Sequence, residues 1–251
     1  MEAILSALAE QHAELDGMLV GLDESGWQRP TRCEGWNVAD VVLHLSQTDE
    51  LALASARGHF ADGLAILSGG LTPRGTVDDG AAAMVEQQRG LPPAAILERW
   101  RTGTAALRAA LAAGDPHGRV TWVAGQLSMR TLATTRLAEC WIHTGDVAGA
   151  LEVVQPATDR LEHIARLAWR TLPYAFERDG RTLSGPVAFD LRAPSGGRWR
   201  FTPEGEATTV IEGPGAELCL VAARRVEPAA TALRGTGPDV DAVLQLVRTY
   251  A

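Results

Sequence analysis

The sequence contains no lysine, and all 23 of its basic residues are arginine. Mechanisms that need a lysine Schiff base or a lysine general base are therefore excluded. No run of about 18 apolar residues occurs, so the sequence predicts no membrane-spanning helix. The first 19 residues, MEAILSALAEQHAELDGML, place acids where a signal peptide needs positive charge. We therefore expect a cytoplasmic protein.

Cysteine is also scarce, and Cys33, Cys140 and Cys219 are widely separated and odd in number. Because no Cys-x-x-Cys pair exists, the sequence indicates neither a disulfide framework nor a thiolate zinc site. We interpret all three cysteines as small, buried or half-buried hydrophobic residues. The net charge of −8 argues against a broad nucleic-acid-binding surface.

Apolar residues recur at helical spacing through the first two thirds of the 251-residue chain. Asn37 is a good N-cap, with Asp40 in the capping-box position, and Ser128 or Thr131 opens a later helix. The predicted helices cover residues 1–20, 37–56, 81–90, 94–113, 128–147 and 158–178, with an extended link at 119–128. This pattern is typical of a helical bundle.

The pattern changes near residue 180, where apolar and polar residues begin to alternate between Gly and Pro. Such alternation predicts strands joined by turns. The predicted strands lie within 185–194, 197–205 and 207–215, and predicted helices follow at 216–226 and 239–250. We therefore expect an α+β protein, with a helical bundle over residues 1–155, then a linker helix and a small α+β domain over residues 156–251.

Six histidines are present, and each needs a partner before it counts as functional. His12 and His163 follow acids on amphipathic helices, so we place them in solvent. His117 lies in a turn and His59 near a helix end. His44 differs, because it stands between Leu43 and Leu45 on a strongly apolar segment. Taken alone, it fits a buried structural histidine.

Glu139 and His143 are four residues apart in the stretch LAECWIHTGDV, so they share one face of a helix. They are either an exposed ion pair or two ligands aimed at one point. Their helix is largely apolar, and burying an unpaired carboxylate there is costly. If His44 faces them, the set suits Zn²⁺ with one open position, and also non-haem Fe(II) or Ni²⁺. Asp146 is placed to hold the second ring nitrogen of His143.

Two segments, GWQRPTRCEGWNVADVVLHL and RTLATTRLAECWIHTGDVAGAL, carry a family resemblance. Together they resemble the maleylpyruvate isomerase family of actinobacterial, mycothiol-dependent, metal-binding enzymes. The shared features are W-x(2)-P-T-x-C-x-G-W, V-x-x-H-L and R-L-x-E-x-W-x-H-x-x-D-V. They fall on Trp27, Pro30, Thr31, Cys33, Gly35, Trp36, His44, Arg136, Glu139, Trp141, His143 and Asp146.

The resemblance implies a DinB-like four-helix bundle followed by a small sterol-carrier-like domain. It implies His44, Glu139 and His143 as zinc ligands and mycothiol as the thiol cosubstrate. The expected activity is that of an isomerase or a thiol S-transferase acting on an electrophilic or unsaturated small molecule. Family resemblance also places a functional arginine near the C-terminal helix, where Arg224 and Arg225 are equal candidates to anchor a substrate carboxylate; Arg74 is a weaker candidate.

Two other functions stay open at this point. One is a non-catalytic protein that binds a metal and a small molecule through its C-terminal domain. The other is a zinc hydrolase that uses zinc-bound water and needs no thiol. In each case we expect a monomer or homodimer without nucleic-acid or membrane partners. We expect Trp27 and Trp36 to pack their turn onto the bundle, and Trp141 to pack between helices.

Overall fold

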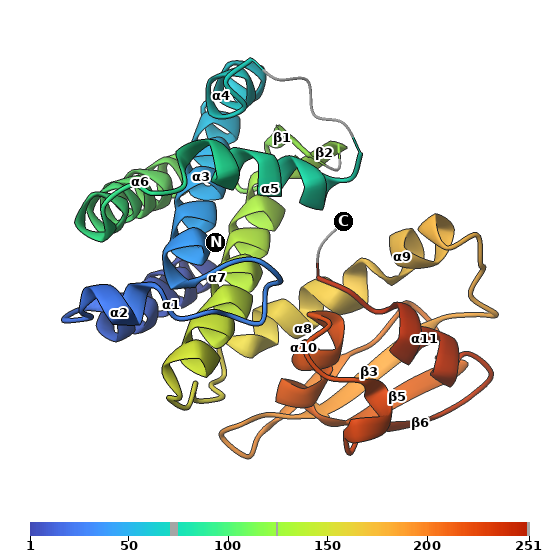
Figure 1. Ribbon diagram of the computed structural model, residues 1–251. Helices are drawn as coiled ribbons and strands as arrows, with labels where there is room; N and C mark the ends of the chain where they lie inside the picture. Colours follow the sequence, from blue (N-terminus) through green and yellow to red (C-terminus); the bar gives the residue numbers. More distant parts are fainter. Residues whose placement is uncertain (71–74, 124, 250–251) are drawn as a thin grey trace. The chain divides into compact units, whose positions relative to one another are not determined.

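The structure is a computed structural model that describes residues 1–70, 75–123 and 125–249. The chain forms two compact units, Met1–Gln155 and Pro156–Ala251. Helices fill most of the first unit, and the second unit combines short helices with a four-stranded sheet (Figure 1). The predicted α+β fold class is thus confirmed. Among the described residues, no helix has both the length and the apolar character that a membrane crossing requires.

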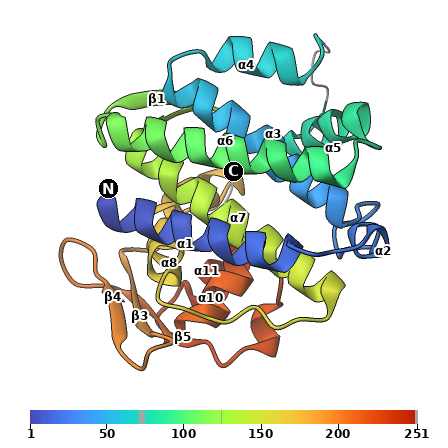
Figure 2. The same cartoon turned by 90° about the vertical axis from the view of Figure 1, so that its left-hand side faces the viewer.

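Four long helices organise the first unit (Figure 2). They are α1 (Glu2–Leu19), α3 (Val38–Ala56), α6 (Pro93–Ala113) and α7 (Met129–Leu151). Helices α1 and α3 each pack against both α6 and α7, so the four helices enclose a common core. Leu15, Leu45, Trp100 and Val147, one from each helix, are buried in it. The described residues of this unit also form three shorter helices: α2 (Glu24–Trp27), α4 (Phe60–Leu67) and α5 (Val77–Gln88).

Side-chain caps fix where the two central helices begin. The Asn37 side chain accepts a hydrogen bond from the backbone N–H of Asp40 at 2.9 Å, and the Asp40 carboxylate accepts one from the N–H of Asn37 at 3.1 Å. This confirms the predicted capping box and sets the start of α3. The Ser128 hydroxyl accepts from the N–H of Thr131 at 3.2 Å, so α7 begins after Ser128.

Several segments of the first unit differ from their predictions, and the short helices α2 and α4 were not predicted. Helix α5 begins at Val77, four residues earlier than predicted, because Thr76 and Asp79 form a second capping box. The predicted extended link is a hairpin, in which β1 (Arg119–Trp122) pairs with β2 (Gly125–Ser128) in antiparallel fashion. The extended conformation was predicted, but the pairing was not.

The sheet of the second unit has the strand order β4-β3-β5-β6, with β3 and β5 parallel and the other neighbours antiparallel. Its strands are β3 (Val187–Arg192), β4 (Arg198–Phe201), β5 (Thr209–Pro214) and β6 (Arg234–Thr236). The first three confirm the predicted strands. The fourth was not predicted, because three residues are too few to show alternation.

The helices of the second unit are shorter than predicted. They are α8 (Leu161–Arg170), α9 (Leu172–Arg178), α10 (Gly215–Ala222) and α11 (Val240–Leu246), with a 3₁₀ turn η1 (Pro228–Ala230). The predicted 158–178 helix is divided into α8 and α9 at Thr171, just before Pro173, which lacks an N–H donor. Helix α10 ends at Ala222 rather than at 226, since Arg224 adopts a left-handed conformation with φ of 57°.

His12 lies in the core of the first unit, so the prediction that it sits in solvent is wrong. Its side chain contacts the edge of Trp100, and its Nδ1 lies 2.6 Å from Nη1 of Arg108. Because arginine only donates, Nδ1 accepts and the ring proton lies on Nε2, 4.0 Å from Asp49. Burial, then the charges of Arg108 and Arg136, lower the pKa of His12 to about 3. His163 is half-buried, so its placement in solvent is also wrong.

The lowered pKa of His12 makes the stability of the protein depend on pH. Below pH 6.5 the unfolded chain takes up a proton at His12 and the folded chain does not, so acid favours unfolding. From pH 7 to pH 5, this group removes about 2 kcal/mol of unfolding free energy. Between pH 7 and pH 5, the unfolding free energy of His12→Gln should therefore fall by about 2 kcal/mol less than that of the wild type. Urea denaturation at the two pH values measures both falls.

The matched control is His59→Gln, which changes an exposed side chain and should leave the wild-type profile in place. An equal fall in unfolding free energy in the wild type and in His12→Gln would contradict a lowered pKa of His12 as the source of this pH dependence.

Candidate metal centre

Three side chains from α3 and α7 converge on one point. Nε2 of His44 lies 3.0 Å from Oε1 of Glu139, and Nε2 of His143 lies 3.5 Å from the same oxygen. One ligand atom from each residue lies within 4.8 Å of the other two. The structure thus brings together the three residues that the sequence singled out as ligands.

Local structure explains this convergence. His44 lies on the side of α3 that faces α7, as its contact with Glu139 shows, and the four-residue spacing places Glu139 and His143 on one face of α7. The two imidazole rings meet edge to face, with centroids 5.0 Å apart. Both histidine side chains are about nine-tenths buried, whereas the Glu139 side chain remains 24% exposed.

The charges of the three groups depend on one another. Burial alone would raise the pKa of Glu139, but hydrogen bonds and charge from His143 and His44 hold it well below its usual value. Burial lowers the pKa of His44, although Glu139 opposes this effect. Burial also disfavours the charged form of His143, yet Asp146, Cys33 and Glu139 raise its pKa well above the ordinary value. The cluster therefore holds an ionised carboxylate between two imidazoles of different basicity.

Asp146 fixes the orientation of the His143 ring. Its Oδ2 lies 3.0 Å from Nδ1 of His143, and the Asp146 side chain is buried. A carboxylate accepts a hydrogen bond, so the ring proton is held on Nδ1 and Nε2 is directed at Glu139. This is the arrangement expected for Asp146 from its spacing, and it is common among histidines that bind metals.

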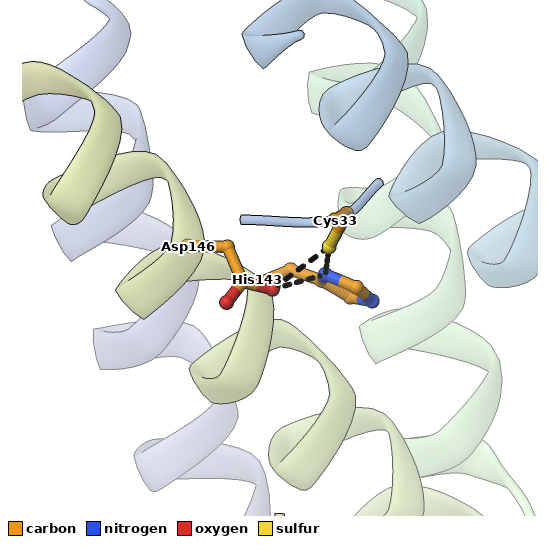
Figure 3. A group of neighbouring side chains, drawn as sticks. All are labelled: Cys33, His143 and Asp146. Carbon is orange, nitrogen blue, oxygen red and sulfur yellow. Dashed lines mark hydrogen bonds and ion pairs between the residues drawn. The ribbon is translucent and has the colours of Figure 1, made fainter. Parts of the chain in front are cut away.

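Cys33 is a member of the site that the sequence analysis missed. Its Sγ donates to Oδ2 of Asp146 at 3.3 Å and lies 3.9 Å from Nδ1 of His143. Figure 3 shows the three side chains facing one another. The sequence predicts only a small, buried or half-buried hydrophobic residue here, because the cysteines are scattered and form no Cys-x-x-Cys pair, and the contact joins residues 110 positions apart. Its place in the T-x-C-x-G-W motif was the one available signal. Cys140 and Cys219 are buried as predicted, and burial raises the pKa of both thiols.

A second buried contact between the two helices was also missed. Nε of Arg136 lies 2.8 Å from Oδ1 of Asp49, and Nη2 donates to the Thr48 hydroxyl at 2.8 Å. The same hydroxyl donates to the backbone carbonyl of His44 at 2.9 Å. Arg136 precedes Glu139 by three residues, so this ion pair joins α3 to α7 one helical turn from the cluster.

The arginines proposed as substrate anchors lie elsewhere in the chain. Arg224 is exposed, and Arg225 is half-buried with Nη1 donating to the carbonyl of Ala223 at 3.1 Å. Both belong to the second unit. Arg74 lies outside the described residues. The anchoring role of all three stays a prediction.

Comparison with known proteins identifies the family of the chain region that carries this cluster. A family model described as the mycothiol maleylpyruvate isomerase N-terminal domain matches residues 8–148, a span that contains every residue of the cluster. The chain belongs to the mycothiol maleylpyruvate isomerase family. The resemblance found from the sequence motifs is therefore confirmed.

Individual relatives cover nearly the whole chain. An uncharacterized protein from two strains of Mycobacterium tuberculosis is 31% identical over 245 residues, which are 97% of this chain and 93% of the relative. A crystal structure of the mycothiol-dependent maleylpyruvate isomerase matches with a TM-score of 0.62 at 19% identity, over 94% of this chain and 92% of that one. A histidine-to-alanine mutant of that enzyme gives the same score and identity, over 95% of both chains. These structural matches show a shared fold.

The buried Arg136–Asp49 pair should be essential to the stability of the first unit. Arg136→Met leaves the Asp49 carboxylate buried without its cation, which should cost about 3–5 kcal/mol of unfolding free energy. The matched control is Arg29→Met, which breaks an exposed pair with Glu152 in the same unit and should cost about 0–1 kcal/mol. Urea denaturation of the metal-free proteins measures both losses. Similar losses in the two variants would contradict the role given to the buried pair.

Proposed function

We propose that this protein is a metal-dependent enzyme that uses mycothiol, or a thiol of that kind, to act on an electrophilic or unsaturated small molecule. The observation that carries the proposal is the convergence of His44, Glu139 and His143 within the region matched by the family model. The solved enzyme that shares this fold is a mycothiol-dependent maleylpyruvate isomerase. We extend the thiol dependence in that name to this chain as part of the proposal.

The chemistry of the three groups fits a divalent metal ion. Two imidazole nitrogens and one carboxylate oxygen are typical zinc ligands, and three protein ligands leave a place for an external group. Both Nε2 atoms lie close to the same Glu139 oxygen, while Nδ1 of His143 is already occupied by Asp146. We therefore assign His44, Glu139 and His143 as the residues that hold the metal, with Zn²⁺ as the preferred ion.

When bound, zinc acts as a Lewis acid that stabilises a thiol as its thiolate at neutral pH. The protein's own residues prepare the site for that chemistry. Asp146 holds the proton on Nδ1 of His143, and burial of both histidines limits the access of water. Neither nearby cysteine serves as nucleophile in this account, because Cys33 contacts Asp146 and Cys140 contacts Thr144.

The reaction proposed for the thiol is addition to a conjugated double bond. Addition of sulfur to one carbon and of a proton to the conjugated system leaves a single bond that rotates. Loss of the same sulfur and proton restores the double bond in the other geometry and regenerates the thiol, so no oxidant or reductant is needed. In a transferase, the sulfur stays on the carbon. A guanidinium suits the carboxylate of such a substrate, and Arg224, Arg225 and Arg74 are the proposed candidates.

Removing one ligand tests the proposal. Purified wild-type protein should contain bound divalent metal by elemental analysis, and conversion of an unsaturated acid should require both the metal and mycothiol. Loss of a residue that only supports a ligand can cost about 100-fold in metal affinity. His44→Ala removes a ligand itself, so its metal affinity should fall by more than that, and conversion should fall with it. The control His59→Ala changes an exposed histidine outside the cluster and should behave as the wild type.

Other outcomes would contradict this proposal in distinct ways. Unchanged metal content in His44→Ala would show that the metal is not held by the cluster. Hydrolysis of an ester or amide without any thiol would favour a zinc hydrolase. Ligand binding without conversion, unaffected by mycothiol, would favour a non-catalytic binding protein.

A further inference from the structure

The segment from Pro30 to Asn37, here called the 30–37 loop, is closed by its own backbone. Pro30 and Asn37 form an antiparallel bridge, and the N–H of Thr31 donates to the carbonyl of Trp36 at 2.9 Å. The N–H of Trp36 in turn donates to the carbonyl of Cys33 at 2.9 Å. The Thr31 hydroxyl donates to the Trp36 carbonyl and accepts from the N–H of Cys33. These bonds fix the directions of the Cys33 and Trp36 side chains.

One of these side chains supports His143. Oδ2 of Asp146 accepts from the thiol of Cys33 at 3.3 Å, and the same oxygen lies 3.0 Å from Nδ1 of His143. Figure 3 shows the thiol against the Nδ1 edge of the His143 ring. The loop and the histidine therefore share one buried acceptor, so the position of the carboxylate depends on both.

The other side chain contacts His44. The Trp36 and His44 ring centroids are 5.1 Å apart, with the planes tilted by 48°. Nδ1 of His44 is buried and meets no hydrogen-bond partner in the described part of the chain. Most histidines that bind metals donate from their second nitrogen to an oxygen. His44 instead has an aromatic ring beside it, and its orientation depends on packing.

We propose that the 30–37 loop positions both histidines of the metal centre, Cys33 acting on His143 through Asp146 and Trp36 acting on His44 by ring packing. The inference rests on the proposed function, because it treats these histidines as ligands. It gives the loop motif a physical role: the two helices supply the ligands, and the loop holds their side chains in register. Cys33 and Trp36 are positioning residues in this account.

Cys33 could instead be a ligand itself, since Cys33, His143 and Asp146 also lie close enough together to hold an ion. We favour a positioning role for Cys33 because His143 belongs to both possible ligand sets, the one with Cys33 and Asp146 and the one with His44 and Glu139. A metal on its Nδ1 would displace the proton that Asp146 holds there and separate the short contact between them. A thiolate ligand to Co²⁺ produces a charge-transfer absorption, so the two roles are distinguishable.

Variants of the two cysteines of the first unit test the role of Cys33. Cys33→Ala removes the thiol, and Cys33→Ser keeps a donor in its place. The control Cys140→Ala removes a thiol that lies near Thr144 on α7, the helix that carries Glu139 and His143. In metal-free protein at one fixed pH, histidine-ring nitrogen NMR should show altered His143 signals in Cys33→Ala. The signals should stay close to wild type in Cys33→Ser and in Cys140→Ala.

Titration with Co²⁺ then measures the effect on the site. Cys33→Ala should weaken binding by about tenfold, the lower end of the cost of losing an outer partner, because Cys33 acts through Asp146. Cys33→Ser should restore most of the affinity. Unchanged His143 signals and unchanged affinity in Cys33→Ala would overturn the proposal. So would a sulfur-to-cobalt absorption band, present in wild type without added thiol and absent in Cys33→Ala, because it would make Cys33 a ligand.

Trp36 is tested in the same way. Trp36→Ala should alter the ring signals of His44 while leaving those of His143 in place, and Trp36→Phe should restore them in part. Unaltered His44 signals in Trp36→Ala would overturn its role. The NMR comparison needs no metal, so it tests positioning even if the wild type fails to bind Co²⁺. That failure would contradict the proposed function alone.

Discussion

The Glu139 carboxylate lies between two buried imidazoles, and the rest of the first unit is arranged around that contact. An isolated charge at this place would cost several kcal/mol, so the partner histidines must be present and correctly aimed. His44 comes from α3 and His143 from α7, which means that the two helices must keep a fixed register. The buried Arg136–Asp49 pair, one turn away, joins the same two helices and adds a second charged contact between them. Buried polar groups of this kind disfavour alternative packings, because each misplacement leaves a charge unpaired.

The three sequence motifs of the family serve this one arrangement in different ways. The helix motifs supply the three groups that converge, while the 30–37 loop supplies contacts to their far sides. Asp146 connects the two, since one of its oxygens meets both His143 and Cys33. A site built this way has few degrees of freedom left at its histidines. That rigidity suits the proposed centre, in which the protein would hold an ion and leave the reactive sulfur to a cosubstrate.

Much of this arrangement could be predicted from local signals in the sequence. The Asn37 capping box and the four-residue spacing of Glu139 and His143 are short-range features, so they can be recognised without knowledge of the tertiary fold. The use of His44 as their partner required the family motifs, because nothing local relates residues 95 positions apart. Cys33 and His12 were misjudged for the same reason: their partners, Asp146 and Arg108, are distant in the sequence. Polar residues on a helix look solvent-exposed until the packed neighbour that pairs with them is known.

The proposed metal centre is defined by the atoms that would surround the ion, and X-ray absorption at the zinc edge of the purified, zinc-loaded protein measures these directly. Without added thiol, the ion should show only nitrogen and oxygen neighbours at about 2.0–2.1 Å, with an imidazole signature from His44 and His143. Addition of mycothiol should introduce one sulfur neighbour at about 2.3 Å. A sulfur neighbour before thiol is added, or none afterwards, would contradict a centre held by two histidines and a glutamate that binds its thiol from outside.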